Sequence, residues 1–170
     1  MYNNNGFNRG NNRPNQSYGQ PQPSIQPVKA EPLPDDYVKK AEEAIGALKE
    51  IENNDRRQKV ITTSKLRSLF SLFSETYNEV VRGDQEKLTP SQISVLSAAK
   101  VRVYYEIGRE DGYRGSLDTG SVGRFVKHSN LLQYLSDIGD SCEKLIQFYH
   151  YMEALVAFHR YYFGEKKDNR

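Results

Sequence analysis

Apolar residues recur at spacings of three and four along most of the chain after residue 34, which is the period of one helical face. The first such run follows Asp35 or Asp36 and reaches about Glu52, and its stripe comprises Val38, Ala41, Ile45, Leu48 and Ile51. No run alternates with the period of two that is typical of a half-buried strand. The pattern therefore predicts an all-α fold.

Two further helices are marked by their first residues. Thr62 or Thr63 is the predicted N-cap of a helix that reaches about Arg82, where Gly83 is a stop signal. The sequence Thr-Pro-Ser-Gln at 89–92 combines a capping box with a first-turn proline, and predicts a helix to about Gly108.

The C-terminal part of the chain predicts two more helices. One spans about 122–138, but its apolar stripe changes phase at 128–130, where we expect a kink or a short break. Ser141 caps the last helix, which reaches about Phe163 and is apolar around more than half of its circumference. A helix of that kind lies at the centre of a bundle. We expect a compact five-helix bundle over 34–164, with 165–170 frayed.

Residues 1–33 differ in composition from the rest, since they are rich in Asn, Gly, Pro and Gln and contain almost no core-forming residues. Such a segment cannot bury enough apolar surface to offset its ordering entropy, so it is predicted to be a disordered tail. Two roles stay open for this tail. It is either an inert solubilising segment, or a weak RNA contact through Arg, Tyr and Phe side chains.

Charge and cysteine content narrow the possible functions. The net charge of +2 resides in the tail, so the folding unit is neutral and would bind a polyanion only if its charges were segregated onto faces. The single cysteine, Cys142, excludes an intrachain disulfide and fits a reducing, cytoplasmic compartment. The sequence has no apolar leader and no run long enough for a membrane helix, so no membrane partner is expected.

Motifs of catalysis and of metal binding are missing from the sequence. The three histidines and one cysteine have no metal-ligand spacing, and the glycine-rich 108–123 segment, interpreted as a loop, lacks a phosphate-loop motif. His150 and His159 are interpreted as packed, hydrogen-bonded core residues. Cys142 is interpreted as structural, because no histidine pairs with it by spacing. We therefore expect no catalytic residue, no metal and no cofactor.

Basic residues at particular places remain as candidates. Lys65 and Arg67 occupy the first turn of the second helix, where acids are usual and where the helix dipole favours anions. Arg102 and Arg109 lie seven residues apart on the third helix, and Arg124 and Lys127 open the fourth. Two interpretations stay open: contacts to an external polyanion, or ordinary solvated charges.

Lys100 also lies on the third helix, at nearly the angular position of the apolar Ile93 and Ile107. Either its stem snorkels to the edge of the stripe, or the stripe opens there onto a ligand.

Three stretches taken in order, ITTSKLRSLFSLFSETYN, LSAAKVRVYYEIGR and IQFYHYMEALVAFHRYYFG, resemble the Csm small subunit of type III-A CRISPR effector complexes. The resemblance covers most of 56–164. It implies a helical bundle, present in several copies, that serves antiviral defence without catalysis of its own and binds target RNA through its phosphates without sequence preference. It implies as partners the guide-RNA ribonucleoprotein, neighbouring copies of the chain, and the backbone and large polymerase-like subunits.

The family's basic positions match six residues of this chain, which the resemblance implies are RNA-binding: Lys65 and Arg67 of TTSKLR, Lys100 and Arg102 of AKVR, Arg109 of EIGR, and Lys127 of RFVK. The Asn-rich tail and the glycine-rich 110–120 segment depart from the family pattern and inherit no role. An alternative function also stays open, namely a helical adaptor that binds protein partners only.

Overall fold

The computed structural model describes residues 28–110 and 113–164, and the regular secondary structure in these ranges is helical, which confirms the predicted all-α class. Within these ranges no β-strand forms, and no helix is both long and apolar enough to cross a membrane. In the described part of the chain, six α-helices and one 3-10 turn follow one another: α1 Tyr37–Asn54, α2 Thr63–Arg82, α3 Pro90–Gly108, η1 Leu117–Thr119, α4 Ser121–His128, α5 Leu131–Asp137 and α6 Cys142–Phe163.

The predicted count of five helices is wrong, because the expected fourth helix is two helices. The chain breaks at 128–130, where the phase change predicted a break, and Asn130 adopts a left-handed conformation with φ of 47°. Ser129 is buried at the break, and its carbonyl accepts a hydrogen bond of 2.8 Å from the Tyr151 hydroxyl of α6. The turn lets α4 and α5 each direct its own apolar stripe into the core.

The predicted helix starts agree with the structure where side chains cap them. Thr62 accepts from the Lys65 backbone N–H at 3.2 Å, Thr89 and Gln92 form the reciprocal capping box, and Ser141 accepts from the Lys144 N–H at 3.3 Å. At α1, by contrast, the Asp36 side chain makes no capping hydrogen bond.

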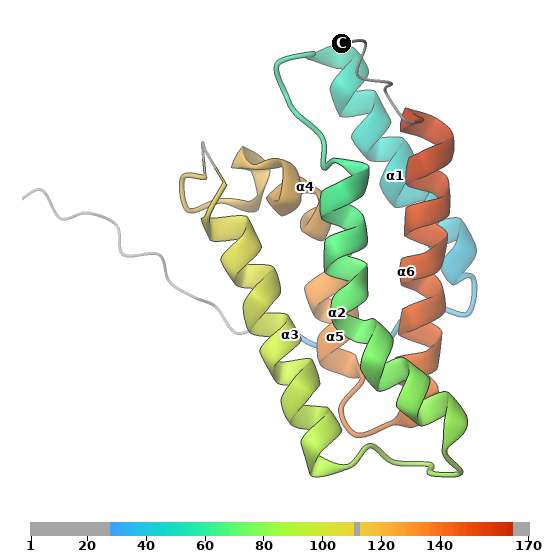
Figure 1. Ribbon diagram of the computed structural model, residues 1–170. Helices are drawn as coiled ribbons and strands as arrows, with labels where there is room; N and C mark the ends of the chain where they lie inside the picture. The colour runs from blue at the N-terminus through green and yellow to red at the C-terminus, as the bar shows by residue number, and fades with distance from the viewer. Residues whose placement is uncertain (1–27, 111–112, 165–170) are drawn as a thin grey trace, which may run out of the picture.

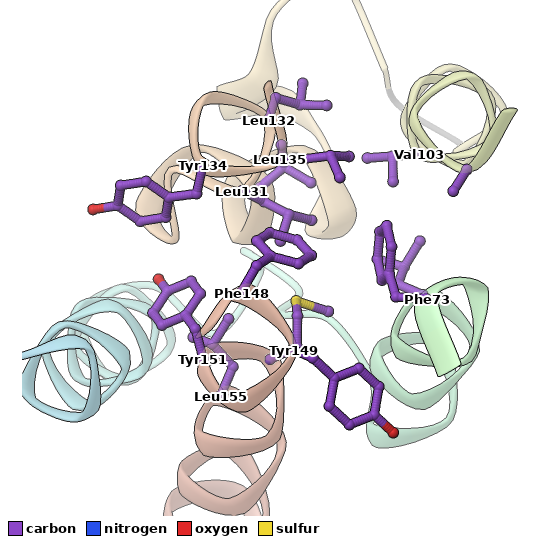
Figure 2. Close-up of a cluster of buried hydrophobic side chains, with 14 of the residues drawn as sticks. Phe73, Val103, Leu131, Leu132, Tyr134, Leu135, Phe148, Tyr149, Tyr151 and Leu155 are labelled. Carbon is purple, nitrogen blue, oxygen red and sulfur yellow. The ribbon is translucent and has the colours of Figure 1, made fainter. Parts of the chain in front are cut away.

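Helix α6 is the centre of the bundle, as its apolar circumference predicted. It packs against α1, α2 and α5, whereas α3 lies at the edge, beside α2 and α4 (Figure 1). Figure 2 shows side chains of α2, α3, α5 and α6 converging on one core. Phe73 of α2 and Phe148 of α6 meet edge to face there, with ring centroids 5.1 Å apart. Aromatic burial thus contributes much of the packing between helices.

The predicted tail of 1–33 falls mostly outside the described residues, as does the predicted frayed end at 165–170. Residues 28–33 are described and have no regular secondary structure. Val28 and Leu33 pack against the core, and the Glu31 N–H donates to the Gln133 carbonyl at 3.3 Å. This short segment therefore lies along the bundle.

Replacing Phe73 by alanine tests the core. Its side chain is fully buried, so Phe73→Ala should lower the free energy of unfolding by about 3–5 kcal/mol, measured by chemical denaturation. Val81→Ala is the control on the same helix, since Val81 is 53% exposed, and should change stability by no more than about 0.5 kcal/mol. Equal effects of the two substitutions would contradict the assigned core.

Candidate functional site

A groove between α2 and α3 collects three of the six predicted RNA-binding residues, Lys65, Arg102 and Arg109. Its volume is about 250 Å³. Its lining, called here the α2–α3 groove, comprises Ser64, Lys65, Ser68, Leu69, Arg102, Glu106, Arg109 and Val122. The groove thus joins the first turns of α2, the C-terminal half of α3 and the start of α4.

Helical spacing explains which cations meet in the groove. Arg102, Glu106 and Arg109 are four and three residues apart, so they share one face of α3. Arg67 and Lys100 each lie only two residues from a groove cation, and residues two apart on a helix do not share a face. Arg67 is accordingly exposed outside the groove lining. The six predicted residues therefore do not form one surface.

Lys100 and Lys127 each form an intramolecular contact with a neighbouring element. The Lys100 Nζ donates to the Ser136 hydroxyl at 2.7 Å and so connects α3 to α5. The Lys127 Nζ lies 2.7 Å from Asp118 Oδ1 and connects α4 to η1. The hydrogen bond from Lys127 also holds the pKa of the Asp118 carboxyl below its ordinary value. Neither lysine lines the α2–α3 groove.

Arg102 and Arg109 are held by one acid between them. One oxygen of the Glu106 carboxylate lies 2.8 Å from Arg102 Nη2, and the other lies 3.2 Å from Arg109 Nε. A guanidinium has five N–H donors, so each arginine keeps further donors for another oxygen ligand. Both side chains are about half exposed, whereas that of Glu106 is 14% exposed. Glu106 therefore orients both guanidinium groups and leaves them with N–H donors for another ligand.

Lys65 is bound by a second acid, Glu110, at a Nζ–Oε1 distance of 2.6 Å. The same Oε1 accepts from the Ser121 hydroxyl at 2.6 Å, and Oε2 accepts from the Val122 N–H at 2.8 Å. Burial by itself would raise the pKa of Glu110, but the hydrogen bonds from Lys65, Ser121 and Val122 hold that pKa below its ordinary value. Glu110 therefore stays ionised and caps α4 from outside the helix.

Sequence reasoning missed Glu110, which lies in the segment interpreted as a loop without a role. The available signal was Gly120, because the N-cap position of α4 has no side chain of its own to satisfy the first N–H groups. A methyl group at position 120 would lie 2.6 Å from Glu110 Oε2. Glycine there leaves room for the carboxylate beside Val122.

Arg124 is buried, so its inclusion among the candidate surface cations is wrong. Its side chain donates to the backbone carbonyls of Asp118 and Lys59, each at 2.7 Å, and its Nε has no partner. It is 8% exposed. Arg124 of α4 thus connects the segment before α2 to η1.

His159 fixes the start of α2 from the end of α6. Its Nε2 donates to the Ile61 carbonyl at 2.8 Å in the tautomer that these partners favour, and its Nδ1 lies 3.4 Å from the Thr63 hydroxyl. This confirms the interpretation of His159 as a packed core residue, with burial lowering its pKa. His150 was wrongly assigned to the core, because it is partly exposed and pairs with Glu153 at 2.9 Å.

Comparisons with known proteins agree on one family. The family model described as Csm2 Type III-A matches residues 35–165. Curated proteins named "CRISPR system Cms protein Csm2" are similar to this chain. The one from Mycobacterium tuberculosis (strain CDC 1551 / Oshkosh) is 34% identical over 129 residues, covering 76% of this chain and 93% of its own length. The one from Streptococcus thermophilus is 33% identical over 131 residues, covering 77% and 94%.

The buried state of His159 predicts a pH dependence of folding. Because its pKa is lowered in the folded state, the unfolded chain binds the proton more readily, so stability falls as pH drops below the unfolded value of about 6.5. His128 contributes with the same sign, since burial lowers its pKa too. Urea unfolding between about pH 8 and 5.5 should show a flatter curve for His159→Gln than for the unsubstituted chain.

The control for that experiment is His128→Gln. This variant keeps His159, so it should retain the part of the stability loss at low pH that His159 causes. A His159→Gln curve parallel to that of the unsubstituted chain would show that His159 does not stay neutral in the fold.

Removing the Glu110 carboxylate should loosen α4. Glu110→Ala leaves the Val122 N–H and the Lys65 ammonium without their partner, and should cost roughly 1–3 kcal/mol of unfolding free energy in chemical denaturation. Glu75→Ala, at an exposed position of α2, is the matched removal of an acid and should cost no more than about 0.5 kcal/mol. Equal values would exclude the capping role.

Proposed function

Because this chain belongs to the Csm2 family of type III-A CRISPR systems, we propose that it is a non-catalytic small subunit that binds target RNA through its sugar-phosphate backbone in the α2–α3 groove. Family membership assigns the chain to a CRISPR complex of antiviral defence. In this chain, the α2–α3 groove contains the cations that would contact an RNA strand.

The observation that carries the RNA-binding proposal is the convergence of Lys65, Arg102 and Arg109 in one groove. These three cations face two carboxylates, so the groove keeps one net positive charge. The first turn of α2 adds the positive end of its helix dipole, which Ser64 and Lys65 border. The guanidinium groups of Arg102 and Arg109 have further N–H donors, and the planar arrangement of these donors matches the geometry of phosphate oxygens.

Binding in this groove would be independent of sequence. Phosphate contacts position a strand but carry no sequence information, which is read at base edges. Two acids hold the groove cations, Glu106 in the lining and Glu110 beside it. Glu106 and Glu110 each form ion pairs with groove cations, so the contacts they make are those of positioning groups.

The proposed partners follow from the resemblance of the whole bundle. They are the guide-RNA ribonucleoprotein, neighbouring copies of this chain, and the backbone and large polymerase-like subunits of the complex. A groove with one net positive charge binds RNA weakly by itself. Repetition along a complex would raise the effective concentration of each groove for the strand.

A second candidate function is a helical adaptor that binds only proteins. The observation favouring it is the outer face of α3, where Val95, Val101, Tyr104 and Tyr105 are exposed. Large apolar side chains gathered on one helix are typical of a protein contact. RNA cross-linking in the assembled complex separates the candidates, since an adaptor would leave the groove peptides unlinked.

Neutralising the two groove arginines tests the proposal. The Arg102→Gln, Arg109→Gln double variant of the full chain should bind single-stranded RNA more weakly. Its slope of log affinity against log salt should be smaller by roughly 0.7 for each phosphate that the variant no longer neutralises. Fluorescence anisotropy over a salt series measures both quantities.

The control is a double variant with the same change in net charge, Lys39→Gln with Arg82→Gln, at exposed positions of α1 and the end of α2. It should keep the original slope, and circular dichroism should show that both variants are folded. If the slope falls by the same amount in both double variants, the effect is one of net charge, and the assignment of the groove is wrong.

A further inference from the structure

Tyr105 lies beside the α2–α3 groove and outside the hydrophobic core. We propose that Tyr105 is a stacking platform for an unpaired base of single-stranded RNA, and this inference rests on the proposed function. Tyr105 is 54% exposed, although it is one of the large residues of the bundle. The residue belongs to none of the buried or partly buried sets that form the core.

The ring and the groove share two side chains. The guanidinium carbon of Arg102 lies 4.8 Å from the Tyr105 ring centroid, and that of Arg109 lies 5.8 Å from it. Both arginines also line the groove. Tyr105 precedes the groove residue Glu106 by one position, which turns it about 100° around α3 toward the rim. A strand whose phosphates contact these arginines therefore passes its bases beside the ring.

The surroundings of the ring favour stacking with a base. Exposed cation–π contacts contribute about 0.5–1 kcal/mol each, and they restrict the ring before a ligand arrives. Because Glu106 fixes both guanidinium groups, the ring and its two arginines form one aligned set. Aromatic and guanidinium planes are the surfaces on which unpaired RNA bases stack.

The platform would also discriminate between states of the RNA. A base inside a duplex is already stacked and paired, so it is not available to the ring. Phosphates are present in both states, so the cations alone do not distinguish them. The groove cations contact phosphates in either state. Tyr105 would add a preference for unpaired nucleotides.

The test compares a short single-stranded RNA with an abasic oligomer of the same length, which keeps the sugar-phosphate backbone. For the full chain, Tyr105→Ala should weaken binding to the RNA by roughly 5- to 150-fold, the range for removing one base–aromatic stack. The salt slope should not change, because the cations that neutralise phosphates are all retained. Tyr105→Phe, which keeps a ring, should bind as the unsubstituted chain does.

The abasic oligomer supplies the discriminating measurement. The unsubstituted chain and Tyr105→Ala should bind it equally, because it has no bases to stack. Tyr161→Ala removes a tyrosine that is 81% exposed at the far end of α6, and should leave both affinities unchanged. Circular dichroism shows whether each variant is folded.

Each other outcome overturns the inference. If Tyr105→Ala weakens binding to both oligomers equally, the ring only positions the arginines. If it changes the affinity for neither oligomer, Tyr105 does not contact RNA, and the proposal for the groove cations is unaffected. A variant that binds RNA normally but fails to join the complex would make the ring a protein contact. An unsubstituted chain that binds neither oligomer contradicts the proposed function as well.

Discussion

The carboxylate of Glu110, whose side chain is 8% exposed, connects the three helices that border the candidate site. It receives the Lys65 ammonium from α2 and the Val122 N–H and Ser121 hydroxyl from α4, while its own backbone continues from the end of α3. Glu110 thereby connects the end of α3 to the first turns of α2 and α4. Without an acid at this point, Lys65 would lose the partner that orients it, and the Val122 N–H would lose its acceptor.

The same arrangement limits how strongly the groove can attract an anion. Each acid that orients a cation also offsets one positive charge. The cations are therefore preorganised, but the positive potential of the groove is lower. A groove of this kind is suited to contacts that are individually weak and repeated. The spare N–H donors of Arg102 and Arg109, rather than the net charge of the chain, determine what it can bind.

Local chemistry explains why the helix starts were predictable. A capping threonine or serine and a first-turn proline act within four residues, so the starts at Thr62, Thr89 and Ser141 could be read without the fold. The break near Asn130 was visible as a phase change. The number of helices was wrong because a phase change locates a break and does not show whether the axis continues beyond it.

The sequence by itself determined the helical class, the central place of α6 and the spacing that puts Arg102 and Arg109 on one face, because these depend on the period of the α-helix. Tertiary structure alone decided that Lys65 joins them, that Lys100 turns to Ser136, and that Arg124 is buried. The fate of a charged side chain depends on partners far away in the chain. Those partners, Glu110 above all, become neighbours only when the helices pack.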